Sequence, residues 1–210
     1  MQEEREQEAG ERGERRDARA NRQLLLDVTK RLFAAQGVAA TTMKQVAEAA
    51  GVGKGTLYRH FADKGELCRA LIREDLLAFQ ERVGARLADA RGTPSALARL
   101  ELLIAERIRL TETHLPLFAA IEEVTAGSLE QAKKFRGPFA IWTHARLVAL
   151  LGEAVEQGSV APLDVPLAAD VILAAMSPAL LGYQRHECGY SVERIIAGMC
   201  ALFVDRLRVD

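Results

Sequence analysis

Apolar residues recur at helical spacing along most of the chain, and no stretch shows the period-two alternation of a β-strand. The first helical pattern begins at Leu24, continues through Val28 and stops at Gly37, a residue suited to the left-handed C-terminal cap of a helix. The only apolar side chain larger than alanine in residues 1–18 is Met1, so this stretch cannot offset the entropy of ordering. We predict a mobile, disordered tail over 1–18, followed by a helix that ends at Gly37.

Two capping signals divide the next segment into short helices. Thr42 is followed three residues later by a glutamine, the spacing of a capping box, and Gly51 ends the helix that the box starts. A second short helix is predicted at 54–61. Asp63 is followed at the same spacing by a glutamate, which predicts the start of a long helix reaching about residue 90.

Later helices are separated by short joints that contain glycine or proline. Thr93 places a cap residue before a first-turn proline and predicts a helix that runs to about Glu112. The remaining joints are expected at 114–116, 127–128, 137–138 and 158–166. The composition, with 49% hydrophobic and 27% charged residues in a chain of 210, is typical of an ordinary globular protein. We therefore predict an all-α fold with about nine helices.

Charge is distributed unevenly along the chain. Residues 21–66 carry a net charge of +3, whereas residues 1–20 and 67–210 carry −2 each. A basic segment joined to a larger, slightly acidic one is typical of a nucleic-acid-binding module with a separate regulatory body. The sequence contains no apolar run long enough for a membrane span, and its N-terminus lacks the apolar stretch of a secretory signal. We expect a cytoplasmic protein that contacts no membrane and needs no metal ion or cofactor.

The segment 41–67 has the pattern of a helix-turn-helix. Ala47 is small where the two helices cross, and Gly51 occupies a left-handed turn in which a Cβ is expected to clash. Leu57 and Phe61 lie four residues apart on the buried side of the second helix. The residues left outside are rich in cations and hydrogen-bond donors: Gly55, Thr56, Tyr58, Arg59 and His60. Such a face fits the major groove of DNA, although two short helices of this kind also form corners in ordinary bundles.

Four motifs follow one another in this region: FAAQG at 33–37, TxxxVAxAAGV at 42–52, KGTLYRHF at 54–61 and DKxxL at 63–67. Together they make residues 21–66 resemble the DNA-binding domain of the tetracycline-repressor (TetR) family. The resemblance implies a three-helix helix-turn-helix domain at 19–66 and a larger helical domain at 67–210 for effector binding and dimerisation. It further implies a ligand-responsive transcriptional regulator, usually a repressor, which binds a pseudo-palindromic double-stranded operator as a homodimer and is released by a small molecule.

Carried over by position, the resemblance implies two kinds of DNA contact. The positions that match family residues holding operator phosphates are Thr42, Tyr58, His60 and Lys64. The positions that match family residues meeting base edges or the groove wall are Lys44, Lys54, Gly55, Thr56 and Arg59. The side-chain chemistry agrees, because arginine binds guanine through two hydrogen bonds and lysine reaches guanine acceptors or phosphates.

Two apolar stripes in the C-terminal part, at 167–181 and 192–207, predict the dimer contact. Their expected interface residues are Val171, Ala175, Ile196, Met199 and Phe203. The last helix is apolar on two sides, so one of its faces is left for a partner. The alternative is that both stripes pack inward on their own chain.

The effector is expected to bind among the helices between about 95 and 158. Its contacts are predicted from an apolar set and a polar set: Phe118, Phe139 and Trp142, and His114, Glu122 and Arg146. A mainly apolar lining with few polar groups is the usual small-molecule site, so the unknown effector is expected to be largely apolar. For each of these residues, ordinary core packing or exposure is the alternative.

Sequence signals of an enzyme are lacking. The run GVGKGT at 51–56 has neither the spacing nor the preceding strand of a phosphate-binding loop, and there is no G-x-S-x-G motif. The four histidines include no HExxH pattern. We therefore do not expect an enzyme. A small all-α enzyme with an accidental helix-turn-helix, and a constitutive DNA-binding protein without an effector, are the alternatives.

Overall fold

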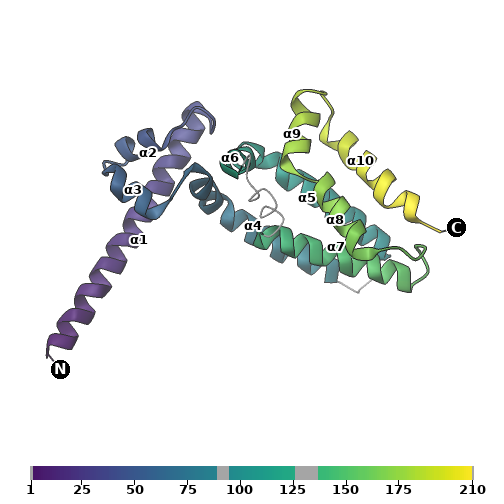
Figure 1. Ribbon diagram of the computed structural model, residues 1–210, viewed down its shortest axis with the longest axis horizontal. Helices are drawn as coiled ribbons and strands as arrows, with labels where there is room; N and C mark the ends of the chain where they lie inside the picture. Colours follow the sequence, from purple (N-terminus) through teal and green to yellow (C-terminus); the bar gives the residue numbers. More distant parts are fainter. Residues whose placement is uncertain (1, 89–94, 126–136, 210) are drawn as a thin grey trace. The chain divides into compact units, whose positions relative to one another are not determined.

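The computed structural model describes residues 2–88, 95–125 and 137–209. In these ranges the chain forms ten α-helices and one short 3-10 turn, and its only β feature is an isolated bridge between Val160 and Arg208. The predicted all-α fold is confirmed. The chain divides into two compact units, Met1–Leu71 and Ile72–Asp210 (Figure 1).

The N-terminal unit contains α1 (Gln2–Gln36), α2 (Met43–Ala49), α3 (Lys54–His60) and the start of α4 (Lys64–Ala88). Its core is apolar and draws on all four helices: Leu25, Leu26, Val46, Ala47, Leu57, Phe61 and Leu67. Helix α1 ends at the predicted place because Gly37 adopts a φ of +82°, which glycine accepts without steric cost.

Helix α1 begins at Gln2, whereas the sequence predicted a disordered tail over 1–18. The difference has a local cause, because Glu, Arg, Gln and Ala dominate this stretch and are all strong helix formers. A helix that is already nucleated by packed residues further along the chain extends at little cost, without burying apolar surface. The proposed division of the chain at 1–18, 19–66 and 67–210 stays a prediction.

The second unit combines the rest of α4 with six further helices and the final turn. These elements are α5 (Ala96–Thr113), α6 (Leu115–Thr125), α7 (Pro138–Glu156), α8 (Val165–Ala175), α9 (Pro178–His186), α10 (Val192–Phe203) and the 3-10 turn η2 (Asp205–Leu207). Helix α5 packs against α7, α9 and α10, and α7 packs against α8. The central helix α5 buries Leu100, Leu103 and Ile104 completely. This unit therefore has its own hydrophobic core.

Two helix boundaries differ from the sequence prediction. Helix α5 is capped by Ser95, whose Oγ accepts from the amide of Ala98 at 3.2 Å. The cap predicted at Thr93 and the joint at 127–128 lie outside the described residues. The joint before α6 is the single residue His114, because Pro116 stands in the first turn of α6, where a proline leaves no hydrogen bond unmade.

The apolar stripe at 167–181 is divided between α8 and α9 rather than lying on one helix. Pro178 has no amide hydrogen for a continuing helix, and the Oγ of Ser177 accepts from the amide of Leu180 at 3.4 Å to start α9. The chain bends by 43° at this break. Among the described residues no single helix is long and apolar enough to cross a membrane, and only α8 and α9 taken together reach that length and composition.

Candidate nucleic-acid interface and effector region

The start of α2 is fixed by the predicted capping box, which is confirmed. The amide of Gln45 donates to Thr42 Oγ1 at 3.3 Å, and the amide of Thr42 donates to Gln45 Oε1 at 2.8 Å. Two amide donors at the helix end are thereby satisfied by side chains of the same turn. The entry of α2 is thus determined within four residues of sequence.

The turn between α2 and α3 has the predicted backbone but not the predicted clash. Gly51 adopts a φ of +67°, and the amide of Val52 donates to the carbonyl of Ala47 at 3.0 Å. A Cβ at Gly51 would meet no atom within 4 Å, so the expected collision is absent. Glycine is favoured here because the left-handed conformation is itself costly for other residues.

Helix α3 buries one side and presents the other to solvent. Leu57 is completely buried and Phe61, just past the helix end, is 1% exposed. On the outer side Arg59 is exposed and Tyr58 keeps 52% of its surface accessible. Near the start of the helix Gly55 is exposed, and a Cβ added to it would meet no atom within 4 Å. The outer side of α3 is therefore an open surface of cations, donors and bare backbone.

Besides Thr42, whose hydroxyl belongs to the capping box, Lys44 and Lys64 also have partners within the chain. Lys44 Nζ lies 3.6 Å from Glu48 Oε1, one turn along α2, and both side chains are about two-thirds exposed. A pair this exposed contributes little and exchanges readily for a phosphate. Lys64 Nζ donates to the carbonyl of Ala39 at 3.2 Å and so connects α4 to the loop before α2. Lys64 thus has a structural contact that the sequence did not reveal, and its remaining donors are those available to DNA.

His60 lies in a cationic environment at the end of α3. Partial burial lowers its pKa, and the positive charges of Arg59 and Arg22 lower it further. The guanidinium of Arg22 lies over the ring of Phe61, 5.0 Å from its centroid. The imidazole is therefore mostly neutral at pH 7, and a phosphate contact by His60 would be a hydrogen bond rather than an ion pair.

This environment predicts a pH dependence of stability. Because the folded-state pKa of His60 is lowered, the unfolded chain binds more protons, and stability is lost as the pH falls below about 6.5. We expect the unfolding free energy of the wild type to fall more between pH 7.5 and 5.5 than that of His60→Gln, measured by urea unfolding. Equal falls in the two proteins would contradict the assignment, since the other histidines are common to both.

The predicted effector region contains an aromatic cluster, formed by Phe79, Phe139 and Trp142. Phe139 and Trp142 of α7 stack with ring planes 5° apart and centroids at 6.4 Å. Phe79 of α4 meets both rings edge-on, at 5.5 and 5.9 Å. Arg146 is exposed, with its guanidinium 5.6 Å from the Trp142 ring centroid. The structure thus brings three of the predicted effector contacts together, namely Phe139, Trp142 and Arg146.

The other predicted effector contacts lie on or beside α6. Phe118 and Glu122 are partly buried on this helix. His114, which joins α5 to α6, has its Nε2 3.5 Å from Asp75 Oδ2 of α4. The role of all six residues in effector binding stays a prediction.

Arg107 of α5 is a buried charged residue, only 6% exposed, that was not among the predicted site residues. Its guanidinium lies 4.7 Å from the ring centroid of Phe139 and 5.7 Å from that of Phe118. The signal for it was present, because Arg107 continues the helical spacing of the buried positions Leu100 and Ile104. A cation on the apolar side of a helix is the feature that would have identified it.

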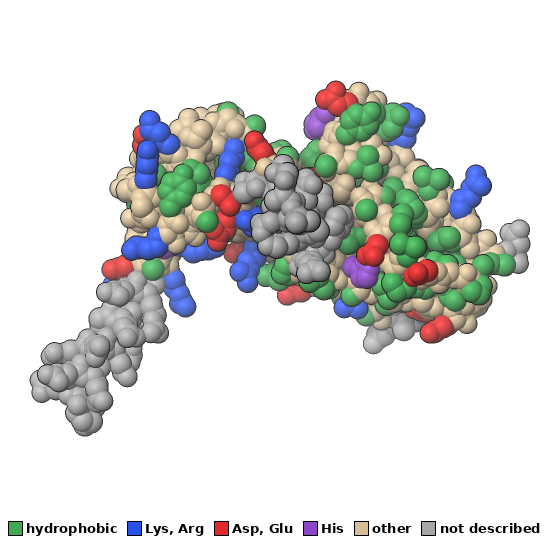
Figure 2. Space-filling model, in the orientation of Figure 1, with side chains coloured by type: hydrophobic (Ala, Val, Ile, Leu, Met, Phe, Trp, Pro, Cys, Tyr) green, Lys and Arg blue, Asp and Glu red, His purple; other side chains and the backbone are tan. Residues whose placement is uncertain are grey.

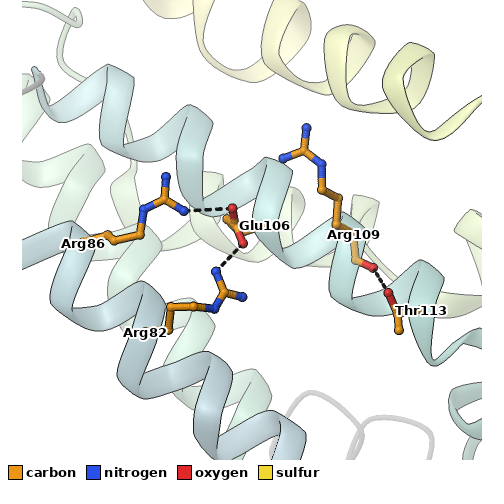
Figure 3. Close-up of polar contacts among 5 residues, drawn as sticks. All are labelled: Arg82, Arg86, Glu106, Arg109 and Thr113. Atoms are coloured by element: carbon orange, nitrogen blue, oxygen red, sulfur yellow. Dashed lines mark hydrogen bonds and ion pairs between the residues drawn. The ribbon is translucent and has the colours of Figure 1, made fainter.

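The residue before Arg107 holds α4 against α5 (Figure 3). Arg82 Nη1 donates to one oxygen of Glu106 at 2.8 Å, and Arg86 Nη1 donates to the other at 2.9 Å. Burial alone would raise the pKa of Glu106, but the hydrogen bonds and charges of the two arginines outweigh it and lower the pKa. In Figure 3, Arg109 points its guanidinium away from this cluster.

The predicted dimer contact is only partly on the surface. Val171 of α8 is 48% exposed, and Leu202 of α10, which lies beside the predicted stripe, is 64% exposed. Hydrophobic side chains gather over the face where α8 and α9 lie (Figure 2). Met199, in contrast, is 8% exposed and belongs to the core of its own chain, while Ile196 and Phe203 are half-buried against that core. Which of these residues touch a partner stays a prediction.

The sequence of the N-terminal unit has known relatives. Residues 25–71 match the family described as bacterial regulatory proteins, tetR family. An HTH-type transcriptional regulator of Staphylococcus aureus strain USA300 is 45% identical over 65 residues, which are 31% of this chain and 35% of that protein. The match to such curated relatives therefore spans about a third of their length.

Solved structures share the fold over most of the chain. The transcriptional regulator FadR from Bacillus subtilis, in complex with stearoyl-CoA, is 22% identical with a TM-score of 0.63, covering 87% of this chain and 97% of that one. The TetR-family regulator PfmR from Thermus thermophilus is 23% identical with a TM-score of 0.60, covering 86% and 97%. Residues 25–71 are therefore an N-terminal DNA-binding domain of the TetR family, and the solved structures share the fold of most of the chain.

Proposed function

We propose that this protein is a ligand-responsive transcriptional regulator that binds a pseudo-palindromic operator as a homodimer and leaves it when a small molecule binds. The observation that carries the proposal is the outer side of α3, where Arg59 and Tyr58 stand exposed on a firmly packed helix-turn-helix. The relatives matched by the N-terminal unit are transcriptional regulators, which favours this function over an enzymatic one.

On the operator, α3 would lie in the major groove with its first turn toward the base edges. Arg59 is suited to guanine, and the exposed Gly55 allows the helix backbone to approach the groove wall. The proposed base and groove contacts are Lys44, Lys54, Gly55, Thr56 and Arg59. The proposed phosphate contacts are Thr42, Tyr58, His60 and Lys64. In a symmetric dimer the two half-sites would lie about one helical turn, roughly 10 base pairs, apart.

Release of the operator by an effector requires a connection between the second unit, where the effector is expected to bind, and the DNA-binding helices. Helix α4 is continuous from Lys64 to Ala88, so it belongs to both units, and Glu106 attaches its second half to α5 through Arg82 and Arg86. A ligand that favours one arrangement of α5 and α4 would therefore bias the DNA-binding unit. One protein of the same fold is a ketosteroid transcriptional regulator and another binds stearoyl-CoA, which is consistent with a largely apolar effector here.

The proposal predicts a specific operator and a reciprocal coupling. Selection of genomic fragments with the purified protein at moderate salt is expected to return one enriched palindromic motif, and transcription from a promoter carrying it is expected to be repressed. An effector found by thermal stabilisation should weaken operator binding about 5-fold to 150-fold, and operator DNA should weaken effector binding by the same factor.

Each alternative has its own result in these assays. The absence of any enriched motif would contradict the regulator function. Specific DNA binding that no metabolite changes would favour a constitutive DNA-binding protein. Turnover of a substrate by protein that retards no DNA would favour an enzyme.

A further inference from the structure

The second unit, Ile72–Asp210, contains a buried cation for which no described residue supplies a counter-charge. Arg107 is 6% exposed, and no carboxylate in the described part of the chain forms an ion pair with it. One guanidinium nitrogen, Nη1, donates to Thr111 Oγ1, while the buried Nε has no hydrogen-bond partner there. Thr111 in turn donates to the carbonyl of Arg107 at 2.9 Å. Thus a fully charged donor group is only partly satisfied.

Arg107 keeps its charge despite burial. Loss of hydration lowers the pKa of its guanidinium to about 10, which still leaves the group protonated at pH 7. A buried charge without a partner is costly, and such groups in proteins are normally paired. The rings of Phe118 and Phe139 offset part of this cost through cation–π attraction. Neither ring supplies a negative charge.

The surroundings of Arg107 are suited to an anion that carries an apolar body. Phe139 stacks with Trp142, and both rings, like that of Phe118, remain partly exposed. These aromatic faces offer apolar area, and the guanidinium offers planar paired donors that match a carboxylate. The guanidinium would recognise the anionic head of such a ligand, and the aromatic rings would recognise its apolar body. The guanidinium lies 4.7 and 5.7 Å from the ring centroids of Phe139 and Phe118, and the centroids of Phe139 and Trp142 are 6.4 Å apart.

We propose that Arg107 anchors the carboxylate of an amphipathic effector whose apolar body packs on Phe118, Phe139 and Trp142. The inference rests on the proposed function, because it names the chemical class of that regulator's effector. Glu106, the preceding residue on α5, holds Arg82 and Arg86 of α4. An anion that binds Arg107 therefore acts on the helix to which α4 is attached.

The test compares acids with their neutral amides. Thermal unfolding of the full chain is measured with 3-phenylpropanoate, 3-phenylpropanamide, decanoate and decanamide, each at about 1 mM, and with acetate as an anion that has no apolar body. We expect at least one of the two larger acids to stabilise the wild type, while its amide and acetate do not. Arg107→Met should lower the affinity for that acid at least about 10-fold.

Two further variants separate anchoring from packing. Arg107→Lys keeps the charge but loses the paired donors, so its affinity for the acid should lie between those of the wild type and Arg107→Met. Arg109→Met removes an exposed arginine of the same helix and should bind the acid like the wild type. Without ligand, Arg107→Met should unfold at the same temperature as the wild type or higher, because an unpaired buried charge has been removed.

Several results would overturn the inference. They are equal stabilisation by acid and amide, no stabilisation by either acid, or unchanged acid binding by Arg107→Met and Arg107→Lys. Operator binding by the same proteins without ligand is measured in parallel. If the wild type binds no DNA, the proposed function is refuted. Even then, stabilisation by an acid that is lost in Arg107→Met would support the anion site.

Discussion

Replacing Val171 and Leu202 together by glutamate is expected to convert a dimer into a monomer of about 23 kDa and to weaken operator binding about 10²-fold to 10⁴-fold. Both side chains are about half exposed or more, so the folded monomer tolerates the charges. In an apolar contact between two copies, however, an unpaired carboxylate is costly. Once the copies separate, the two half-sites are no longer bound as one linked event.

Light scattering and operator titration at micromolar protein measure this result. Leu77→Glu is the control, because Leu77 of α4 is 50% exposed and lies outside the predicted contact. Glutamate at Ile196 or Phe203 is a less selective change, since both side chains pack partly against the core of their own chain. A folded wild-type monomer, or a double variant that remains dimeric with full operator affinity, would refute the predicted interface.

Replacing Arg59 by alanine is expected to weaken operator binding by about 1–3 kcal/mol and to relax the base preference at one position in each half-site. The reason is that a guanidinium paired with guanine distinguishes that base from the other three. Lys44→Ala should act in the same way if its ammonium leaves Glu48 for a base. Tyr58→Phe should weaken binding to all sequences alike, because a phosphate contact carries no base information.

The measurement is a titration of each variant against the operator and against operators with single base changes. Arg31→Ala is the matched control, because Arg31 is an exposed arginine of the same unit that lies outside the predicted contacts. A loss of affinity by Arg59→Ala that is uniform across all sequences would show that Arg59 holds a phosphate instead of reading a base.

Most of the N-terminal unit was predictable because its signals are local. The capping box at Thr42 and the left-handed glycines Gly37 and Gly51 act within a few residues, where sequence spacing and spatial distance coincide. The side of α3 that is buried follows from the spacing of Leu57 and Phe61 alone. The predicted helix at the N-terminus was too short, because a stretch without apolar residues was expected to stay disordered. The helix propensity of these residues was sufficient to extend α1 to Gln2.

For the second unit, the sequence predicted helices and apolar stripes but not how the helices pack. Helical spacing identified apolar stripes, but a helix such as α10 is apolar on more than one side, and spacing does not decide which side faces its own core. Packing placed Met199 inside and left Leu202 outside. Likewise, no joint was predicted at Ser177 and Pro178, and the 43° bend that separates α8 from α9 emerged only in the folded chain.

By itself, then, the sequence determined the all-helical fold, the helix-turn-helix and the residues on its outer side, because these depend on interactions between near neighbours in the chain. The tertiary structure decided which charges are paired. Glu106 is held by Arg82 and Arg86 from a different helix, 24 and 20 residues away in sequence. The adjacent Arg107 is instead buried between aromatic rings without a carboxylate from the described residues. Counter-charges come from whichever helices pack together, and no local pattern encodes that choice.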